Sequence, residues 1–103
     1  MSSMKTVIAL YDDILDAQHA TQDLLYAGFP YEKINIISSD YEGEFDAYLK
    51  KEDETGEYAE GVRRGGTLVI VETSDEEVPR AEEIINRHGP VDIQERSERW
   101  KEG

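Results

Sequence analysis

The residues best suited to chemistry in this sequence are two adjacent arginines followed by two glycines. Arg63, Arg64, Gly65 and Gly66 lie next to an otherwise acidic stretch. Two guanidinium groups beside the exposed amides of a Gly-Gly turn could hold an anion or a partner's carboxylate. In the structural alternative, the arginines complement the negative end of a helix and Gly65 ends that helix in a left-handed conformation. The pattern favours the structural alternative, and we expect any small-ligand site to be at these four residues.

Carboxylates and histidines offer weaker candidates. Asp12 and Asp13 could form a general acid–base pair, but adjacent side chains point in different directions and one of them is expected to cap a helix. His88 ends a predicted helix, where an imidazole interacts favourably with the helix dipole, and His19 falls on a polar helix side. The two histidines lack the spacing of a metal-binding pair. We therefore predict no catalytic residue, no metal site and no cofactor.

Composition excludes several further classes of function. The 103 residues contain no cysteine, which removes disulfides, thiolate metal sites and thiol catalysis. A formal net charge of −13 disfavours binding to nucleic acid and to anionic membranes, and it is compatible with a basic protein partner. No targeting segment is visible, and no apolar run approaches the roughly 20 residues of a membrane helix. The expectation is a cytoplasmic protein.

The elements that must position these residues follow from the hydrophobic pattern. Apolar runs predict strands at residues 6–11, 34–37 and 67–71, and alternation predicts an edge strand at 91–95. Apolar residues at helical spacing begin at Ile14, and Gly28 ends that helix. A second helix follows a cap at Ser74 or Asp75 and stops at Gly89. Its predicted inner residues are Val78, Ala81, Ile84, Ile85 and His88.

The two ends of the chain resemble each other, which predicts two βαβ halves in one domain. Such halves form a four-stranded antiparallel sheet with both helices on one face, the ferredoxin-like arrangement of the α+β class. We expect this domain to span residues 1–95, with an acidic helical insertion at 40–64 and a charged C-terminal tail at 96–103. Within residues 40–60, nine carboxylates stand against two lysines, a net charge of −7.

Several segments together resemble the general stress protein 17M-like family, the domain found in bacterial heat-induced stress proteins. They are residues 7–13, residues 27–30 with Ile34 onward, residues 58–69, and residues 87–93 with Arg99 and Trp100. Many relatives carry a long Gly/Ala-rich apolar segment between the halves, where this chain has a short acidic connector. The resemblance implies stress-linked expression in bacteria and brings no established reaction or catalytic residues.

Three functions follow as hypotheses. The first is a non-enzymatic, stress-associated domain that acts through protein–protein contacts and self-association, as a homo-oligomer such as a dimer. The open face expected for such a sheet motivates it. The second is a regulatory domain that binds a small anion or nucleotide near Arg63 and Arg64. The third, ranked last, is an enzyme that uses Asp12 or His88.

Overall fold

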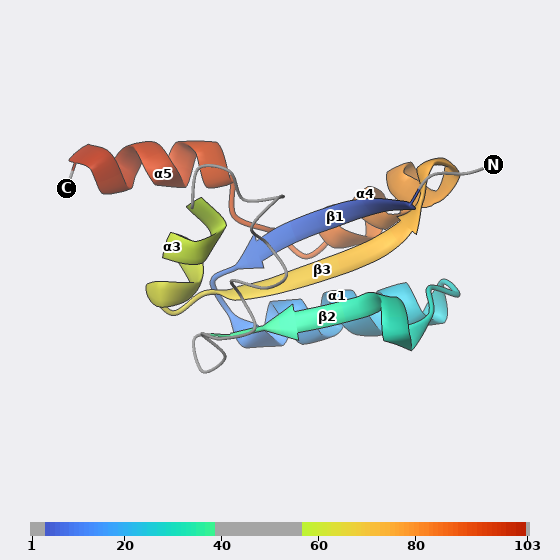
Figure 1. Ribbon diagram of the computed structural model, residues 1–103. Helices are drawn as coiled ribbons and strands as arrows, with labels where there is room; N and C mark the ends of the chain where they lie inside the picture. Colours follow the sequence, from blue (N-terminus) through green and yellow to red (C-terminus); the bar gives the residue numbers. More distant parts are fainter. Residues whose placement is uncertain (1–3, 39–56, 103) are drawn as a thin grey trace.

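The computed structural model describes residues 4–38 and 57–102 and has an α+β fold built on an antiparallel sheet (Figure 1). The strands are β1 (Met4–Tyr11), β2 (Ile34–Ile37) and β3 (Thr67–Ser74), and the α-helices are α1 (Ile14–Tyr26), α3 (Glu57–Arg63), α4 (Val78–Asn86) and α5 (Ile93–Glu102). Two 3-10 helices, η1 (Tyr31–Lys33) and η2 (Asp75–Glu77), precede β2 and α4. Most of the acidic insertion predicted at residues 40–64 lies outside the described residues, and α3 is its described part.

Within residues 4–38 and 57–102, the sheet has three strands in the order β1-β3-β2. β3 pairs antiparallel with β1 along its whole length, from Met4 opposite Ser74 to Tyr11 opposite Thr67. It also pairs with β2, where Ile34 lies opposite Val71. The central position of β3 explains its nearly continuous apolar sequence, because both faces of a central strand are covered.

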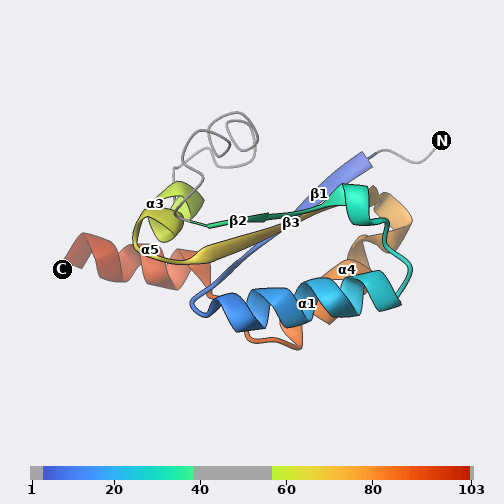
Figure 2. The ribbon, with the colours of Figure 1, turned by 90° about the horizontal axis from the view of Figure 1, so that it is seen from below.

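Each face of the sheet has its own hydrophobic core. Helices α1 and α4 lie side by side on one face, and α3 lies at the other (Figure 2). The core under α1 and α4 consists of Val7, Ala9, Tyr11, Ala17, Ala20, Leu24, Phe29, Ile34, Val69, Val71, Ala81, Ile84 and Ile85. The core on the other face consists of Leu10, Ile37, Val62, Leu68 and Ile70. The alternation of a strand's side chains between faces assigns them to these two layers.

Helix α1 begins and ends as its sequence predicts. An Asp13 side-chain oxygen accepts the amide of Leu15 at 2.9 Å, so Asp13 caps the helix. Gly28 adopts φ of 100°, and the Phe29 amide donates back to the Leu24 carbonyl at 3.1 Å. This closing turn buries Phe29 beside α1 and fixes where β2 starts.

Helix α4 starts later than predicted. Of the two expected cap residues, Ser74 is the last residue of β3 and Asp75 is the first of η2, so that α4 begins at Val78 with Pro79 in its first turn. Of its predicted inner residues, Ala81, Ile84 and Ile85 are buried and Val78 packs against the core. The helix ends at Asn86, so the predicted inner residue His88 lies beyond it. Continued pairing with β1 up to Met4 extends the strand beyond its apolar run.

The fourth strand predicted at residues 91–95 does not form, and the described sheet is not the four-stranded ferredoxin-like sheet expected. Helix α5 begins at Ile93 instead. The Asp92 side chain accepts the amides of Gln94 and Glu95 at 3.2 and 3.3 Å, which caps the new helix. The charged tail expected from Arg96 onward is thus helical up to Glu102.

Candidate functional site

The Arg63–Gly66 segment is the closing turn of α3. Gly65 has φ of 102° and its amide donates to the Val62 carbonyl at 3.0 Å, while the Gly66 amide donates to Gly61 at 2.9 Å. These are the two hydrogen bonds of a glycine-ended helix. The structural interpretation of Gly65 is confirmed.

The glycines flanking this turn allow a close approach to β1. A Cβ atom added to Gly61 would lie 2.5 Å from Leu10 Cδ2, and one added to Gly66 would lie 2.7 Å from Leu10 Cδ1. A larger residue at either position would require the buried Leu10 side chain or α3 to shift. The Gly61 and Gly66 positions therefore serve packing, and Gly66 is itself buried.

Both arginines of the candidate ligand site share one carboxylate. Arg64 Nε donates to Glu60 at 3.0 Å, and Arg63 donates to the same carboxylate through Nε and Nη2 at 3.3 and 3.2 Å. The pKa of Glu60 is lowered mainly by its hydrogen bond from Arg64 and, to a smaller extent, by those from Arg63. An anion arriving here would compete with a carboxylate that already neutralises part of this charge.

Helix α5 is fastened to the body by charged contacts. The Arg64 guanidinium lies 4.9 Å from the Trp100 ring centroid, a cation–π distance. Arg96 donates two hydrogen bonds of 2.9 Å to Asp12, and the pKa of Asp12 is lowered mainly by that pairing. Asp12, considered above as a catalytic acid or base, therefore joins the end of β1 to α5.

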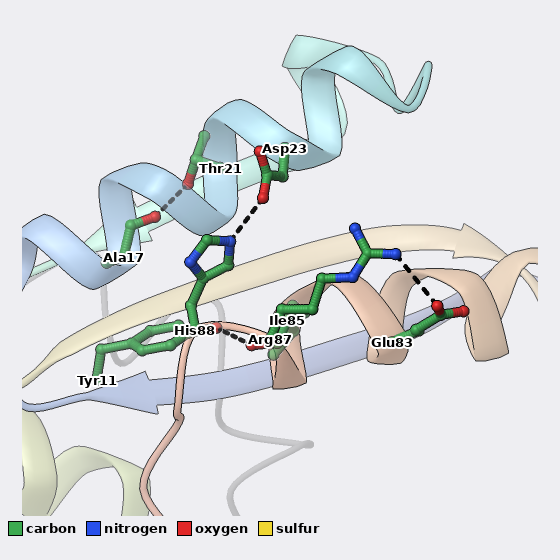
Figure 3. Close-up of polar contacts among 8 residues, drawn as sticks. All are labelled: Tyr11, Ala17, Thr21, Asp23, Glu83, Ile85, Arg87 and His88. Carbon is green, nitrogen blue, oxygen red and sulfur yellow. Dashed lines mark hydrogen bonds and ion pairs between the residues drawn. The ribbon is translucent and has the colours of Figure 1, made fainter.

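The two histidines lie near each other between α1 and the end of α4, and Figure 3 shows the contact of His88 with Asp23 of α1. His88 Nε2 lies 2.7 Å from Asp23 Oδ2, and the centroids of the His88 and His19 rings are 6.3 Å apart. Sequence reasoning did not bring these three residues together, because the contact joins positions 65 residues apart. Across the described ranges, no group of three or more His, Asp or Glu residues is arranged to hold a metal ion.

Tyr11 makes a second long-range contact that the sequence did not reveal. Its hydroxyl, at the end of β1, donates to the Ile85 carbonyl of α4 at 2.7 Å (Figure 3). Burial, and to a smaller extent the negative charge of Asp16, raises the pKa of Tyr11 to about 12. The available sequence signal was the polar tip of a tyrosine at the end of an apolar strand, since buried phenols need a partner.

Shallow clefts mark the outer side of the α1–α4 pair. One, of about 400 Å³, is lined by Asp23 and Tyr26 of α1, by Arg80 and Glu83 of α4, and by Arg87 directly after α4, among others. The arginines are already paired here, Arg80 with Glu77 at 3.4 Å and Arg87 with Glu83 at 3.1 Å. The two arginines are therefore paired with glutamates of η2 and α4, and Asp23 is paired with His88.

The opposite side of α1 carries an uncharged stripe. Ile14, Gln18, Thr21 and Leu25 follow each other at helical spacing, next to the buried residues of the helix and away from Asp23. Ile14 is 48% exposed and Leu25 is 38% exposed. Ile36 of β2, the edge strand above α1, is also 38% exposed and points to the face that α1 covers. We call these five residues the α1–β2 stripe.

Comparison with protein-family models, with curated proteins and with solved structures finds no match to this chain. The resemblance to the general stress protein 17M-like family thus stays a prediction. Within the described ranges, no helix has the length and apolar character needed to cross a membrane.

Proposed function

We propose that this chain is a non-enzymatic protein-interaction domain that associates with a second copy of itself through the α1–β2 stripe. The observation that carries the proposal is the absence of charge from this stripe, in a chain of which 34% of residues are charged. Apolar side chains that are a third to a half exposed gain free energy when a partner covers them.

The net charge of −13 favours this particular surface for self-association. Two like-charged copies repel each other, and the repulsion is smallest where the contacting surfaces themselves carry no charge. A two-fold dimer uses the same patch on both subunits, and a stripe of apolar and uncharged residues is compatible with itself.

The positions of Asp12 and His88 support a non-enzymatic role. Each is hydrogen-bonded to a residue distant in the sequence, Arg96 in one case and Asp23 in the other. Both contacts join secondary-structure elements of the fold. These structural contacts account for the presence of Asp12 and His88 without a catalytic role.

The wider assignment rests on the sequence resemblance. We propose a ferredoxin-like domain of the general stress protein 17M-like type, in which a helix replaces the fourth strand. The order β1-β3-β2 with antiparallel pairing supports this, since a fourth strand in that fold lies beside β1. The proposed context is the bacterial cytoplasm under stress.

Sedimentation velocity across micromolar to millimolar concentrations tests the self-association. The expected result is a reversible dimer that Leu25→Glu converts to a monomer, because a carboxylate in the contact must be desolvated. Leu15→Glu is the matched control, since Leu15 is 55% exposed and lies on the solvent side of the same helix. A strict monomer at millimolar concentration, or equal effects of both variants, would contradict the proposal.

The anion-binding alternative near Arg63 and Arg64 makes a different prediction. A thermal-shift series with phosphate, nucleotides and organic acids should then raise the melting temperature, and Arg64→Ala should abolish that rise. Because Glu60 already forms ion pairs with both arginines, we expect no such stabilisation.

A further inference from the structure

The outer edge of β1 begins a strand pairing that the described part of the chain does not continue. The Val91 amide donates to the Leu10 carbonyl at 2.7 Å, from the side of β1 opposite β3. In a strand, the N–H and C=O of one residue point to the same edge, and the edges alternate along the chain. Thr6 and Ile8 therefore present their backbone groups to this same outer edge.

The chain turns away from this edge directly after that first bond. Asp92 caps α5, and the Arg96–Asp12 pair holds the helix near the C-terminal end of β1 (Figure 1). Among the described residues, no backbone hydrogen bond beyond that of Val91 reaches the outer edge of β1. The unused length from Met4 to Ile8 is about 13 Å, enough for a segment of about five extended residues.

A cleft of about 340 Å³ runs along the same edge. It is lined by residues 6–9 of β1, by Tyr58 of α3, by Glu82, Ile85 and Asn86 of α4, and by Pro90 and Val91. The cleft thus brings the outward backbone groups of β1 together with an apolar and an acidic residue of α4. This is the combination that holds an added strand, with hydrogen bonds for the backbone and a pocket for alternate side chains.

We propose that the β1 edge is a docking site for an extended cationic segment of another protein, which adds to the sheet as a fourth strand. The proposal rests on the proposed interaction function and names a second surface and partner for it. Its backbone pairs with Thr6 and Ile8, one apolar side chain enters the cleft beside Ile85, and a lysine or arginine reaches Glu82.

Charge decides the chemistry of this occupant. Glu82 is exposed and is the charged residue that lines the cleft. The neighbouring Glu77 and Glu83 are each paired with an arginine of α4 or its cap, whereas no described residue forms an ion pair with Glu82. A second copy at this edge would bring another Glu82 and another acidic domain to the same place, which opposes self-pairing.

Titration of the ¹⁵N-labelled full chain with three blocked hexapeptides tests the proposal. The first alternates Lys and Val, the second alternates Glu and Val, and the third is the Lys–Val peptide with alternate backbone nitrogens methylated. Only the first should shift the amide resonances of Thr6 and Ile8. It has both the charge for Glu82 and the backbone donors for an edge strand.

Two variants with matched controls locate the site. Glu82→Gln should weaken binding of the Lys–Val peptide roughly three- to tenfold, whereas Glu83→Gln should not change it. Thr6→Pro removes an outward N–H without touching the β1–β3 ladder and should weaken binding more than tenfold. Thr6→Val is its control, because it keeps the amide, and circular dichroism confirms that each variant is folded.

The outcomes separate this inference from the self-association proposal. Equal binding of the methylated peptide, or shifts confined to other acidic surfaces, would overturn the edge site and show electrostatic attraction alone. Concentration-dependent shifts of Thr6 and Ile8 without peptide would overturn it in favour of a second copy. A wild-type chain that stays monomeric in sedimentation but still binds the Lys–Val peptide would contradict the self-association proposal and leave the β1-edge inference standing.

Discussion

Removing one hydroxyl group, in Tyr11→Phe, tests how β1 and α4 are held together. The Tyr11 side chain is 0% exposed, and its hydroxyl is 2.7 Å from the Ile85 carbonyl. The phenylalanine ring fills nearly the same volume, so the substitution removes the hydrogen bond and leaves the packing. At neutral pH, the free energy of unfolding should fall by about 1 kcal/mol. The cost stays this small because the Ile85 carbonyl keeps a bond from the His88 amide, at 3.2 Å.

The pH dependence of that difference is the sharper part of the prediction. The pKa of Tyr11 is raised from 10.0 to about 12, because ionisation in the fold would place a charge in a buried site. Between these values the unfolded chain loses the Tyr11 proton while the folded chain keeps it. The stability associated with the neutral phenol is therefore fully present below the unfolded pKa and is lost as the pH rises through the folded value.

The size of this loss follows from linkage. Each unit of pKa difference corresponds to about 1.4 kcal/mol, so roughly 2.7 kcal/mol disappears across the whole window. At about pH 11 the wild-type chain has lost about 1.4 kcal/mol through Tyr11, whereas Tyr11→Phe has lost nothing through this position. The wild type, more stable at neutral pH, should then be no more stable than the variant.

Urea unfolding followed by circular dichroism, on both chains from neutral pH into the alkaline range, measures this crossing. Tyrosinate absorbance of the wild type minus that of Tyr11→Phe isolates the ionisation of Tyr11. A stability difference that does not change with pH would refute the reasoning, since Tyr11 would then ionise equally in both states. A difference spectrum that appears near the ordinary tyrosine pKa would refute it as well.

Further substitutions test three other features of the fold. Arg96→Ala and Asp12→Ala should each loosen α5, with a coupling below about 1 kcal/mol in a double-mutant cycle, since Asp12 is largely exposed. The pKa of Asp12 is lowered, so this coupling is present above the ordinary carboxyl pKa and should vanish as the pH falls through the folded value. Gly65→Ala should cost about 1 kcal/mol in thermal unfolding, because Gly65 has φ of 102° and no steric neighbour. His88→Ala should cost a similar ~1 kcal/mol in urea unfolding, and nothing in an Asp23→Ala background.

Local signals accounted for the elements that the sequence predicted well. The sequence predicted both ends of α1, at Asp13 and Gly28, because helix capping and left-handed turns depend on a few adjacent residues. The Arg63–Gly66 segment was assigned to a helix end for the same reason. Ligand binding at this segment depends on the surroundings of Arg63 and Arg64. There Glu60, one helical turn away, accepts hydrogen bonds from both guanidinium groups.

Residues 91–95 show where local reasoning reached its limit. Their alternating pattern is compatible with a strand, yet five residues give a weak periodic signal. The chain forms α5 instead, with Asp92 as its cap and with Arg96 and Trp100 docked on Asp12 and Arg64. Those partners lie far away in the sequence, so no local pattern contained them.

The amino-acid sequence alone determined the three described strands, the bounds of α1 and the buried stripe of α4, because hydrophobic periodicity and end-capping residues act over a few positions. The tertiary structure decided that the segment from Ile93 to Glu102 is helical, that Tyr11 joins β1 to α4, and that His88 joins the end of α4 to α1. It also decided that, among the described residues, the backbone of Val91 alone pairs with the outer edge of β1. These outcomes depend on contacts between residues tens of positions apart, whose free energies outweigh local preference only once the sheet and helices have assembled.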